Sequence, residues 1–456
     1  MNRVVSAAFF GLACLSLASC GTIAKLNPIK GHKSNIVAAK GERIPVLAVD
    51  EALRPSDALK GVAFDLPPAQ PVVAWPLPGG SPDQDMVNVQ AAPAFEVAWR
   101  HPVGVGSSRK ADVTAPPVAV DGKIFTMDGQ AQVEATDAKT GRQLWRTDLR
   151  PKNKRDREAW AGGLAVSDGK VLVTSGYRFI AALDSGSGKT LWLKMTTSPI
   201  HAAPTVSSGR VFAVDIDNQL LAFDITTGDE VWSYQALAEP ARVLKASSPA
   251  IFGDEVIAPF SSGELVALSI PNGNAIWNQA LSRSSRTNAL SEIRDIPGRP
   301  VIYKGDVIAA SQSGVVASLD ARTGAPHWQL PVASVNTPWA AGDVVYILSE
   351  AGELIAANRE NGQVYWIVDL NKGQERKAGG FLLIGRKLIK PIWSGPVLAG
   401  DRLVVVNNWG EAVALNARTG ETQRKLKIGD SAYIAPIAYD GMLYVVTDKA
   451  HLVAIR

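Results

Sequence analysis

A short phrase that recurs along the chain constrains the fold more than any other feature of the sequence. It consists of an apolar run ending in Ala-x-Asp, a Thr-Gly pair a few residues later, and a Trp beyond the glycine. The copies are centred on Asp137, Asp184, Asp224, Ser269, Asp320, Asn358 and Asn416. From Trp145 onward, successive Trp residues of the phrase stand 38 to 51 residues apart, and Arg424 replaces the Trp in the last copy. A period of about 40 to 50 residues is typical of the blades of a β-propeller.

The residue types of the phrase indicate a β-hairpin at the outer edge of each repeat. Apolar residues that alternate before the Asp are typical of a half-buried strand. The Asp or Asn stabilises a turn by accepting hydrogen bonds from nearby backbone N–H groups, and a glycine such as Gly141 supplies the positive φ that closes it. The Trp then falls on the outermost strand, where we expect it to pack between neighbouring blades. Seven of the 12 Trp residues occupy this position, namely Trp99, Trp145, Trp192, Trp232, Trp277, Trp328 and Trp366.

A second unit precedes each copy of the phrase and consists of two short apolar strands separated by a glycine turn, as in Pro117–Phe125. Eight such units occur, but only seven phrases follow them. The last unit begins near Pro436 and is followed only by Leu452–Ile455, whereas Phe95–Arg100 is a Trp-containing strand that no repeat precedes. Joining these two ends completes an eighth blade, and residues 95–456 divided by eight give about 45 residues a blade.

The sequence therefore predicts an all-β fold, with one eight-bladed β-propeller over residues 95–456. Each blade is expected to be a four-stranded antiparallel sheet. The ring is expected to close by pairing the N-terminal Trp99 strand with the C-terminal strand that ends at Val453-Ala454-Ile455. Such closure protects the edges of the sheets.

The N-terminus has the features of a secretory signal. Arg3 is followed by the apolar run Val4–Leu17, which is short for a hydrocarbon core about 30 Å thick and typical of a signal peptide. The run ends in Leu17-Ala18-Ser19-Cys20, which resembles the bacterial lipobox. We therefore expect residues 1–19 to be a lipoprotein signal peptide and Cys20 to be the lipidated residue. The alternative is an ordinary cleavage site with an incidental cysteine.

Residues 20–94 differ in composition from the repeats. Ten of the 28 prolines fall between Pro28 and Pro93, which leaves little room for a helix. We expect the lipidated Cys20 to be followed by a Pro-rich tether in extended conformations with weak local order. Its later part, Trp75–Gly80, is expected to pack on the domain that follows.

The charge and the cysteine content exclude several classes of protein. Lys and Arg number 47 against 43 Asp and Glu, for a net charge of +4, so we expect no nucleic-acid partner. The two cysteines, Cys14 and Cys20, both lie near the N-terminus, so the repeats hold no disulfide, no cysteine metal site and no cysteine nucleophile. The five histidines show no metal-binding spacing. We expect no metal site and no catalytic residue.

The phrase Ala-x-Asp-x-x-Thr-Gly-x-x-x-Trp resembles the repeat of the quinoprotein alcohol dehydrogenases, the PQQ-like propellers. Together with the lipobox, the Pro-rich segment and a single propeller, it resembles the BamB family. That resemblance implies a non-enzymatic scaffold lipoprotein, without a cofactor, of the outer-membrane β-barrel assembly complex. It also implies binding to the POTRA domains of BamA, contact with the other lipoproteins of the complex, and anchoring at the periplasmic face of the outer membrane through Cys20. Gly21, which follows the cysteine, fits sorting to that membrane.

The alternative is an enzyme, a PQQ- and calcium-dependent alcohol or sugar dehydrogenase. In that family the enzyme has oxygen ligands for calcium, a catalytic carboxylate and an adjacent cysteine pair against the quinone. The repeats contain no cysteine, and most of their Asp residues stand in turns, where a structural role suffices. The sequence therefore favours the scaffold.

The resemblance also suggests partner-binding residues in two connections between blades. Leu244 and Lys245 precede the blade start Ser247-Ser248-Pro249, with Lys245 where the family has Arg. Asp295 precedes Pro300, and Pro297 stands where the family has a second Asp. The bland alternative is that both are ordinary loops. A further connection, residues 372–390, holds six basic residues and fits either a membrane or partner patch or a solvated loop.

Overall fold

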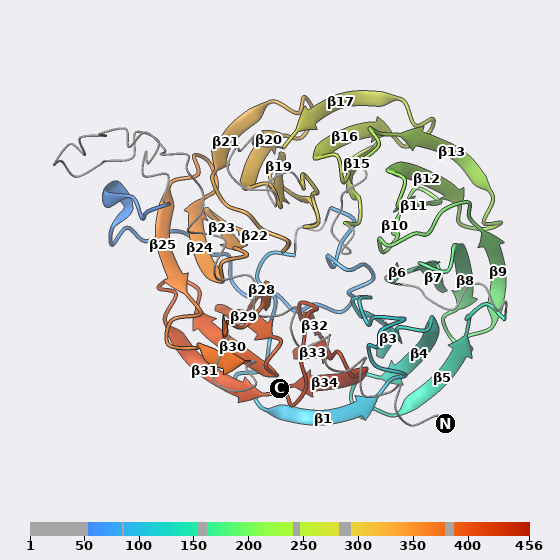
Figure 1. Ribbon diagram of the computed structural model, residues 1–456, viewed down its shortest axis with the longest axis horizontal. Helices are drawn as coiled ribbons and strands as arrows, with labels where there is room; N and C mark the ends of the chain where they lie inside the picture. The colour runs from blue at the N-terminus through green and yellow to red at the C-terminus, as the bar shows by residue number, and fades with distance from the viewer. Residues whose placement is uncertain are drawn as a thin grey trace, which may run out of the picture. The chain divides into compact units, whose positions relative to one another are not determined.

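The computed structural model describes residues 53–83, 86–152, 160, 162–239, 247–281, 293–378 and 387–456. Their strands form eight four-stranded antiparallel sheets, arranged as blades around a central channel (Figure 1). The prediction of an eight-bladed propeller is confirmed. The strands follow the alternation seen in the sequence: the inner three strands of each blade are largely buried and the outermost strand is partly exposed.

Blades 1 to 4 each consist of four consecutive strands, from the channel outward. Blade 1 contains β2 (Val118–Val120), β3 (Lys123–Met127), β4 (Gln132–Asp137) and β5 (Gln143–Asp148). Blade 2 contains β6 (Gly162–Ser167), β7 (Lys170–Ser175), β8 (Phe179–Asp184) and β9 (Thr190–Met195). Blade 3 contains β10 (Thr205–Ser207), β11 (Arg210–Val214), β12 (Gln219–Asp224) and β13 (Glu230–Gln235). Blade 4 contains β14 (Ala250–Phe252), β15 (Glu255–Pro259), β16 (Glu264–Ser269) and β17 (Ala275–Ala280).

Blades 5 to 7 follow the same plan, and blade 8 is built from both ends of the repeats. Blade 5 contains β18 (Val301–Tyr303), β19 (Asp306–Ser311), β20 (Val315–Asp320) and β21 (Pro326–Leu330). Blade 6 contains β22 (Trp339–Ala341), β23 (Val344–Leu348), β24 (Glu353–Asn358) and β25 (Val364–Asp369). Blade 7 contains β28 (Trp393–Ala399), β29 (Arg402–Asn407), β30 (Glu411–Asn416) and β31 (Thr422–Lys427). Blade 8 contains β32 (Ile437–Tyr439), β33 (Met442–Val446), β34 (His451–Ile455) and, outermost, β1 (Val97–Pro102).

The ring closes where β1 pairs antiparallel with β34, as predicted. Trp99 lies opposite Ala454, which is the register of Trp145 opposite Ala135 in blade 1. The backbones of Glu96 and Arg456 exchange two hydrogen bonds of 3.0 and 2.9 Å. Blade 8 therefore reproduces from two chain ends the geometry that the other blades make from one continuous segment.

The repeated Trp locks each blade to the next. The indole Nε1 of Trp145 in blade 1 donates to the carbonyl oxygen of Ser185 in blade 2, at 3.1 Å. A Cβ added to Gly188 of the same turn would lie 2.5 Å from the Trp145 ring. The same arrangement of ring against glycine recurs around the ring in the pairs Trp99–Gly141, Trp192–Gly228, Trp232–Gly273, Trp277–Gly324, Trp328–Gly362 and Trp366–Gly420. The glycine of the phrase thus serves twice, by closing its own turn at positive φ and by leaving room for the preceding blade's indole.

The junction of blades 7 and 8 is built differently, because Arg424 stands in the Trp position of β31. The chain just before β1 fills the space. The guanidinium of Arg402 donates to the carbonyl oxygens of Ala92 and Pro93, at 2.7 and 3.2 Å, and lies 5.8 Å from the centre of the Phe95 ring. Burial, and then the charge of Arg424, lowers the pKa of Arg402.

A proline-rich segment crosses the ring on the side of the turns between first and second strands. We call residues 64–83 and 86–93 the strap; Figure 1 shows it in blue across the centre of the ring. Trp75 and Ala119 of β2 exchange backbone hydrogen bonds of 2.6 and 2.8 Å. Val89 bridges to Ala399 at the end of β28. Trp75 is 1% exposed, so the expectation that Trp75–Gly80 packs on the propeller is confirmed.

The ordered part of the chain begins earlier than the sequence predicted. Instead of a tether with weak local order up to residue 94, the compact unit extends from Ala52 to Arg456. The reason lies in the prolines, which lack an N–H but keep a carbonyl acceptor. Pro76 O accepts from Val166 of β6, and Pro82 O accepts from Ile251 of β14, both through backbone N–H groups. A segment that contacts the blades through irregularly spaced carbonyl acceptors has no periodic hydrophobic pattern, so its order could not be predicted from the sequence. A 3₁₀ helix, η2 (Asp57–Leu59), precedes it.

Candidate functional site

The two faces of the propeller differ in what covers them. Because each blade is antiparallel, the turns between its first and second strands share one face, which the strap crosses. The turns between second and third strands and the connections from blade to blade share the opposite face, which we call the connection face. Among the described parts of the strap, Asp65 O accepts from Asp343, and Val72 O accepts from Asp440, both in turns between first and second strands. The connection face is therefore the face that the strap leaves open.

The residues predicted to bind a partner belong to connections on this face. Leu244 and Lys245 lie outside the described residues, between the end of β13 and the start of β14. Asp295 is described and its residue is 4% exposed. Its carbonyl oxygen accepts from the backbone N–H of Gln312, at 2.9 Å. The Asp295 carboxylate is thus covered rather than displayed at the surface.

Described residues that follow Leu244 and Lys245 in the sequence contact the segment that follows Asp295. Ser247 Oγ donates to the carbonyl oxygen of Gly298, at 3.1 Å, and Arg299 Nε donates to Ser248 Oγ, at 3.4 Å. The start of blade 4 therefore touches the segment that leads into blade 5. Sequence reasoning did not single out Arg299, although a basic residue directly before the blade start Pro300 was a signal that could have found it.

A cavity of about 330 Å³ lies in the central channel, lined by residues that precede the innermost strands of several blades and by the strap. Aromatic rings form much of its wall: Trp75, Trp160, Trp339 and Tyr433. The rings of Trp75 and Trp339 are stacked, with centroids 6.4 Å apart and planes inclined by 25°. The strap residues Trp75, Pro78 and Gly79 belong to the lining, so the strap bounds the cavity on its own face of the ring.

Besides Tyr433, three titratable side chains line this cavity: Asp112, His201 and Arg299. Burial, reinforced by the nearby charge of Asp448, raises the pKa of Asp112. Burial alone lowers the pKa of Arg299 to about 10. Within the described part of the chain, no carboxylate forms an ion pair with Arg299. Arg299 is nevertheless partly exposed, so its positive charge is accessible from the cavity that it lines.

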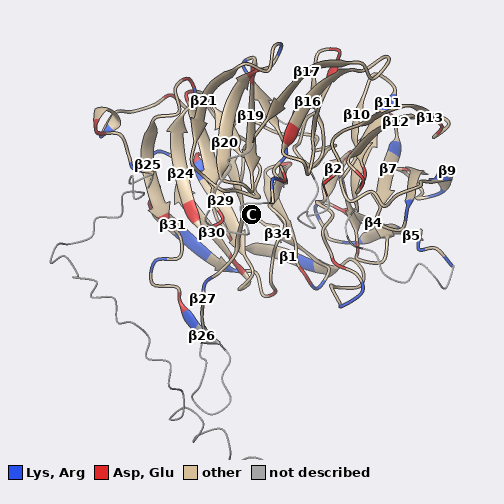
Figure 2. Ribbon diagram, turned by 45° about the horizontal axis from the view of Figure 1, so that its top comes forward, with Lys and Arg blue, Asp and Glu red and all other residues tan. Residues whose placement is uncertain are grey.

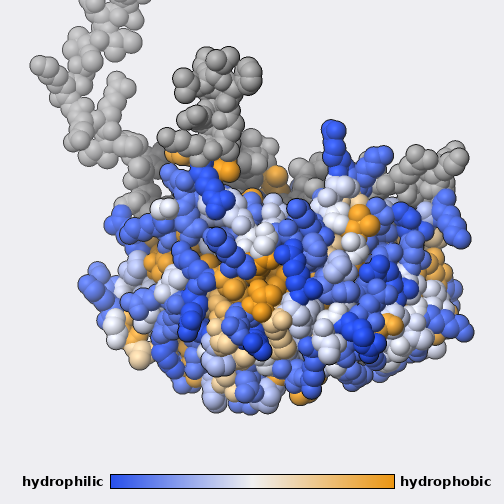
Figure 3. Space-filling view, turned by 90° about the horizontal axis from the view of Figure 1, so that it is seen from below, coloured by the Kyte–Doolittle hydropathy of each residue, from blue (hydrophilic) through white to orange (hydrophobic). Residues whose placement is uncertain are grey.

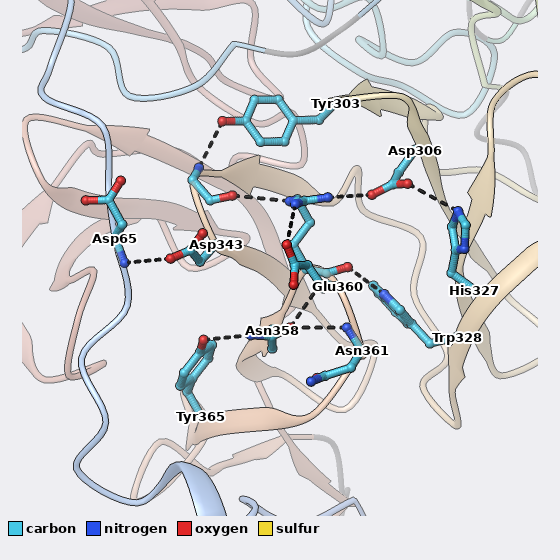
Figure 4. Close-up of polar contacts among 12 residues, drawn as sticks. Asp65, Tyr303, Asp306, His327, Trp328, Asp343, Asn358, Glu360, Asn361 and Tyr365 are labelled. Atoms are coloured by element: carbon cyan, nitrogen blue, oxygen red, sulfur yellow. Dashed lines mark hydrogen bonds and ion pairs between the residues drawn. The ribbon is translucent and has the colours of Figure 1, made fainter.

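The densest polar cluster lies elsewhere, between blades 5 and 6, and is structural (Figure 4). Arg359 donates through Nη1 to Asp306, at 2.6 Å, and through Nε to the carbonyl oxygen of Gly342, at 3.3 Å. Asp306 also lies 3.4 Å from Nε2 of His327. Trp328 donates to the carbonyl oxygen of Arg359, at 2.6 Å. These groups contact one another across the two blades, so the cluster joins blade 5 to blade 6.

A small hairpin projects from the ring between blades 6 and 7 (Figure 2). It contains β26 (Arg376–Ala378) and β27 (Lys387–Ile389), and residues 379–386 between them lie outside the described residues. Leu388 is 54% exposed and the nearby Ile392 is 56% exposed. Arg376 lies 3.8 Å from the centre of the Trp409 ring, so the base of this basic segment is held against blade 7.

The rim of the ring alternates polar and apolar side chains. Figure 3 views it from the β1 side, where hydrophobic residues gather among hydrophilic ones. On β9, the outermost strand of blade 2, Leu191, Leu193 and Met195 are 48%, 41% and 60% exposed. No helix among the described residues is long and apolar enough to cross a membrane.

A family profile described as "Outer membrane protein assembly factor BamB" matches residues 129–368 and 376–456, which is well over half of the chain. The chain belongs to this family. Among curated relatives of that description, the protein of Burkholderia pseudomallei is 28% identical over 348 residues, covering 70% of this chain and 87% of the relative. The protein of Salmonella typhimurium is 25% identical over 386 residues, covering 82% and 94%.

Solved structures show how widely the fold is shared. The crystal structure of BamB from Moraxella catarrhalis matches with a TM-score of 0.63 and 19% identity, covering 77% of this chain and 99% of that one. A quinohemoprotein alcohol dehydrogenase from Pseudomonas putida HK5 matches equally well, with a TM-score of 0.64 and 15% identity, covering 85% and 80%. At these identities the likeness concerns the fold alone.

The described residues of the channel do not fit the calcium site of the dehydrogenases. Among the described residues, no group of three or more His, Cys, Asp or Glu could hold a metal ion. Asp112 is the one carboxylate among the described residues that line the channel cavity. Calcium takes six to eight oxygen ligands, several of them carboxylates in most sites, and the described wall of the channel does not offer such a set.

Proposed function

We propose that this protein is a lipid-anchored, non-catalytic scaffold of the outer-membrane β-barrel assembly complex, which binds the POTRA domains of BamA. The observation that carries the proposal is membership of the BamB family across the blades on both sides of the β26–β27 hairpin. The anchor is Cys20, which holds the protein at the periplasmic face of the outer membrane. Contact with the other lipoproteins of the complex follows from the same role.

The proposed contact lies on the connection face, which the strap leaves open. Leu244 supplies apolar area for burial, and Lys245 supplies a charge that sets orientation. In protein interfaces, buried apolar anchors usually supply affinity and charged residues specificity. Asp295 supplies the acidic contact; since it is only 4% exposed, a partner reaches its carboxylate by displacing what covers it. The hydrogen bond from Ser247 to Gly298, which joins the start of blade 4 to the segment leading into blade 5, supports a contact that uses both connections.

The test is a binding assay between the detergent-solubilised protein and the purified POTRA domains. We expect Leu244→Ala/Lys245→Glu to bind at least tenfold more weakly, and Asp295→Asn to bind more weakly by a smaller factor. Lys425→Glu, an exposed charge reversal on β31, is the matched control and should bind like the wild type. Unchanged binding by folded double variants would move the contact elsewhere, with residues 372–390 as the next candidate.

The dehydrogenase alternative has its own measurement. We expect no dye-linked oxidation of alcohols or sugars by the purified protein, even with added pyrroloquinoline quinone and calcium. Finding the quinone in stoichiometric amount in protein purified from cells would instead support the enzyme.

A further inference from the structure

Arg299 differs from the other arginines that are held inside the propeller. Arg359 pairs with Asp306, at 2.6 Å, and Arg146 Nε donates to the buried Glu134, at 2.8 Å. Arg299 has neutral partners instead: its Nε donates to Ser248 Oγ, at 3.4 Å, and its backbone N–H to a threonine hydroxyl. The two terminal nitrogens of its guanidinium therefore have no hydrogen-bond acceptor within the described residues.

The position of Arg299 makes this lack of a partner informative. It lines the channel cavity of about 330 Å³, a size within the usual range for small-molecule sites. The other titratable groups of the lining, Asp112 and His201, form no ion pair with it in the described part of the chain. Arg299 is partly exposed where it lines the cavity, and no carboxylate among the described residues pairs with it, so its guanidinium can pair with an anion that enters the cavity.

The walls of the cavity restrict the chemistry of that ligand. Trp75 and Trp339 present stacked rings, and Trp160 and Tyr433 add further aromatic surface. Such walls favour a flat apolar body, whereas inorganic phosphate would need several polar donors around it. A planar guanidinium with two free nitrogens matches a carboxylate, which it can bind through two parallel hydrogen bonds.

We propose that the central channel is a binding site for a small aromatic monocarboxylate, whose carboxylate pairs with Arg299 and whose ring lies among the channel tryptophans. One cation in the described lining fits one negative charge, so a polycarboxylate is disfavoured. The site is separate from the proposed partner contact, and its occupancy does not depend on the scaffold function.

Benzoate and indole-3-acetate are the probes, titrated by calorimetry into the full-length protein solubilised in detergent. We expect both to bind the wild type, and benzamide, which has the same shape without the charge, to bind at least tenfold more weakly. Arg299→Gln should weaken benzoate binding at least tenfold, while Arg299→Lys should retain part of it. Arg424→Gln, which removes an exposed arginine outside the channel, should bind like the wild type.

Thermal unfolding gives a second readout that a purely structural arginine would not produce. Without ligand, Arg299→Gln should unfold at about the same temperature as the wild type, because no ion pair among the described residues is lost. Benzoate should raise the unfolding temperature of the wild type but not of Arg299→Gln. Equal benzoate binding by the two proteins, no binding to the wild type, or equally good competition by inorganic phosphate would each overturn the proposal.

Discussion

Two glycines of blade 2 allow the contribution to stability of the contact between the repeated Trp and the next blade's turn glycine to be measured. Gly169, in the turn between β6 and β7, has φ +70°, and a Cβ there would meet nothing within 4 Å. Gly188, in the turn between β8 and β9, has φ +73°, and a Cβ there would lie 2.5 Å from the Trp145 ring and 2.8 Å from Thr147 Oγ1. The backbone conformations match, so a change to alanine at each position differs only in what the new methyl group meets.

The expected magnitudes follow from these surroundings. Gly169→Ala places alanine in the left-handed region, which costs roughly 1–2 kcal/mol in the free energy of unfolding. Gly188→Ala carries the same cost and also forces the indole of Trp145 away, which adds about 1–3 kcal/mol for overpacking. It also endangers the 3.1 Å hydrogen bond from Trp145 to Ser185, worth about 1 kcal/mol. We therefore expect Gly188→Ala to lose about 2–4 kcal/mol more than Gly169→Ala.

The assay is urea denaturation followed by far-ultraviolet circular dichroism, with midpoints compared at equal slope. A third protein, Trp145→Phe/Gly188→Ala, removes the clash while keeping a ring. It should recover part of the loss if the indole is the cause. Equal destabilisation by Gly169→Ala and Gly188→Ala would refute the idea that the glycine of the phrase is required by its neighbour's Trp.

Three further predictions concern the ends of the chain and its turns. A chain that ends at Asp448 lacks β34 and cannot close blade 8, so it should fail to give the cooperative unfolding transition of the full chain. Cys20→Ala should abolish palmitate labelling and release the protein from membranes into the soluble periplasmic fraction, since stable anchoring needs more than one acyl chain. The pKa of Asp137 is lowered, chiefly because the Thr140 side chain donates a hydrogen bond to its carboxylate. The contribution of this carboxylate to the free energy of unfolding is therefore present above the unfolded pKa of about 4, and it is lost as the pH falls through the folded pKa. Asp137→Asn should therefore weaken the dependence of the unfolding midpoint on pH below about 4, as Asn358 already serves the same turn in blade 6 without a charge.

The ring could be predicted from the sequence because its determinants are local and repeated. The turn Asp, the turn glycine and the Trp recur at nearly constant spacing, and each acts within one blade or on the next. The count of eight came from chain ends that complement each other, and the pairing of Trp99 with Ala454 confirms it. The packing of a Trp between neighbouring blades followed from the same phrase, except between blades 7 and 8, where Arg424 replaces the Trp.

The strap and the channel could not be predicted in the same way, because their determinants are single residues that contact distant parts of the chain. Trp75 pairs with Ala119, Val89 with Ala399, and Pro82 with Ile251, at separations that no local pattern encodes. Arg299 carried no motif either. Its environment exists only once the eight blades place their inner strands around one axis, so its missing partner is a property of the closed ring.

The strap also explains why one propeller can have two separate sites. Its proline carbonyls accept hydrogen bonds from backbone N–H groups of β6 and β14, and its Trp75 bounds the channel cavity on one face. On the other face, Ser247 at the start of blade 4 donates to Gly298 in the segment leading into blade 5. Arg299 lies between the two, touching Ser248 on one side and the channel on the other. A ligand that pairs with Arg299 would therefore bind next to the start of blade 4, one of the two connections in the proposed partner contact.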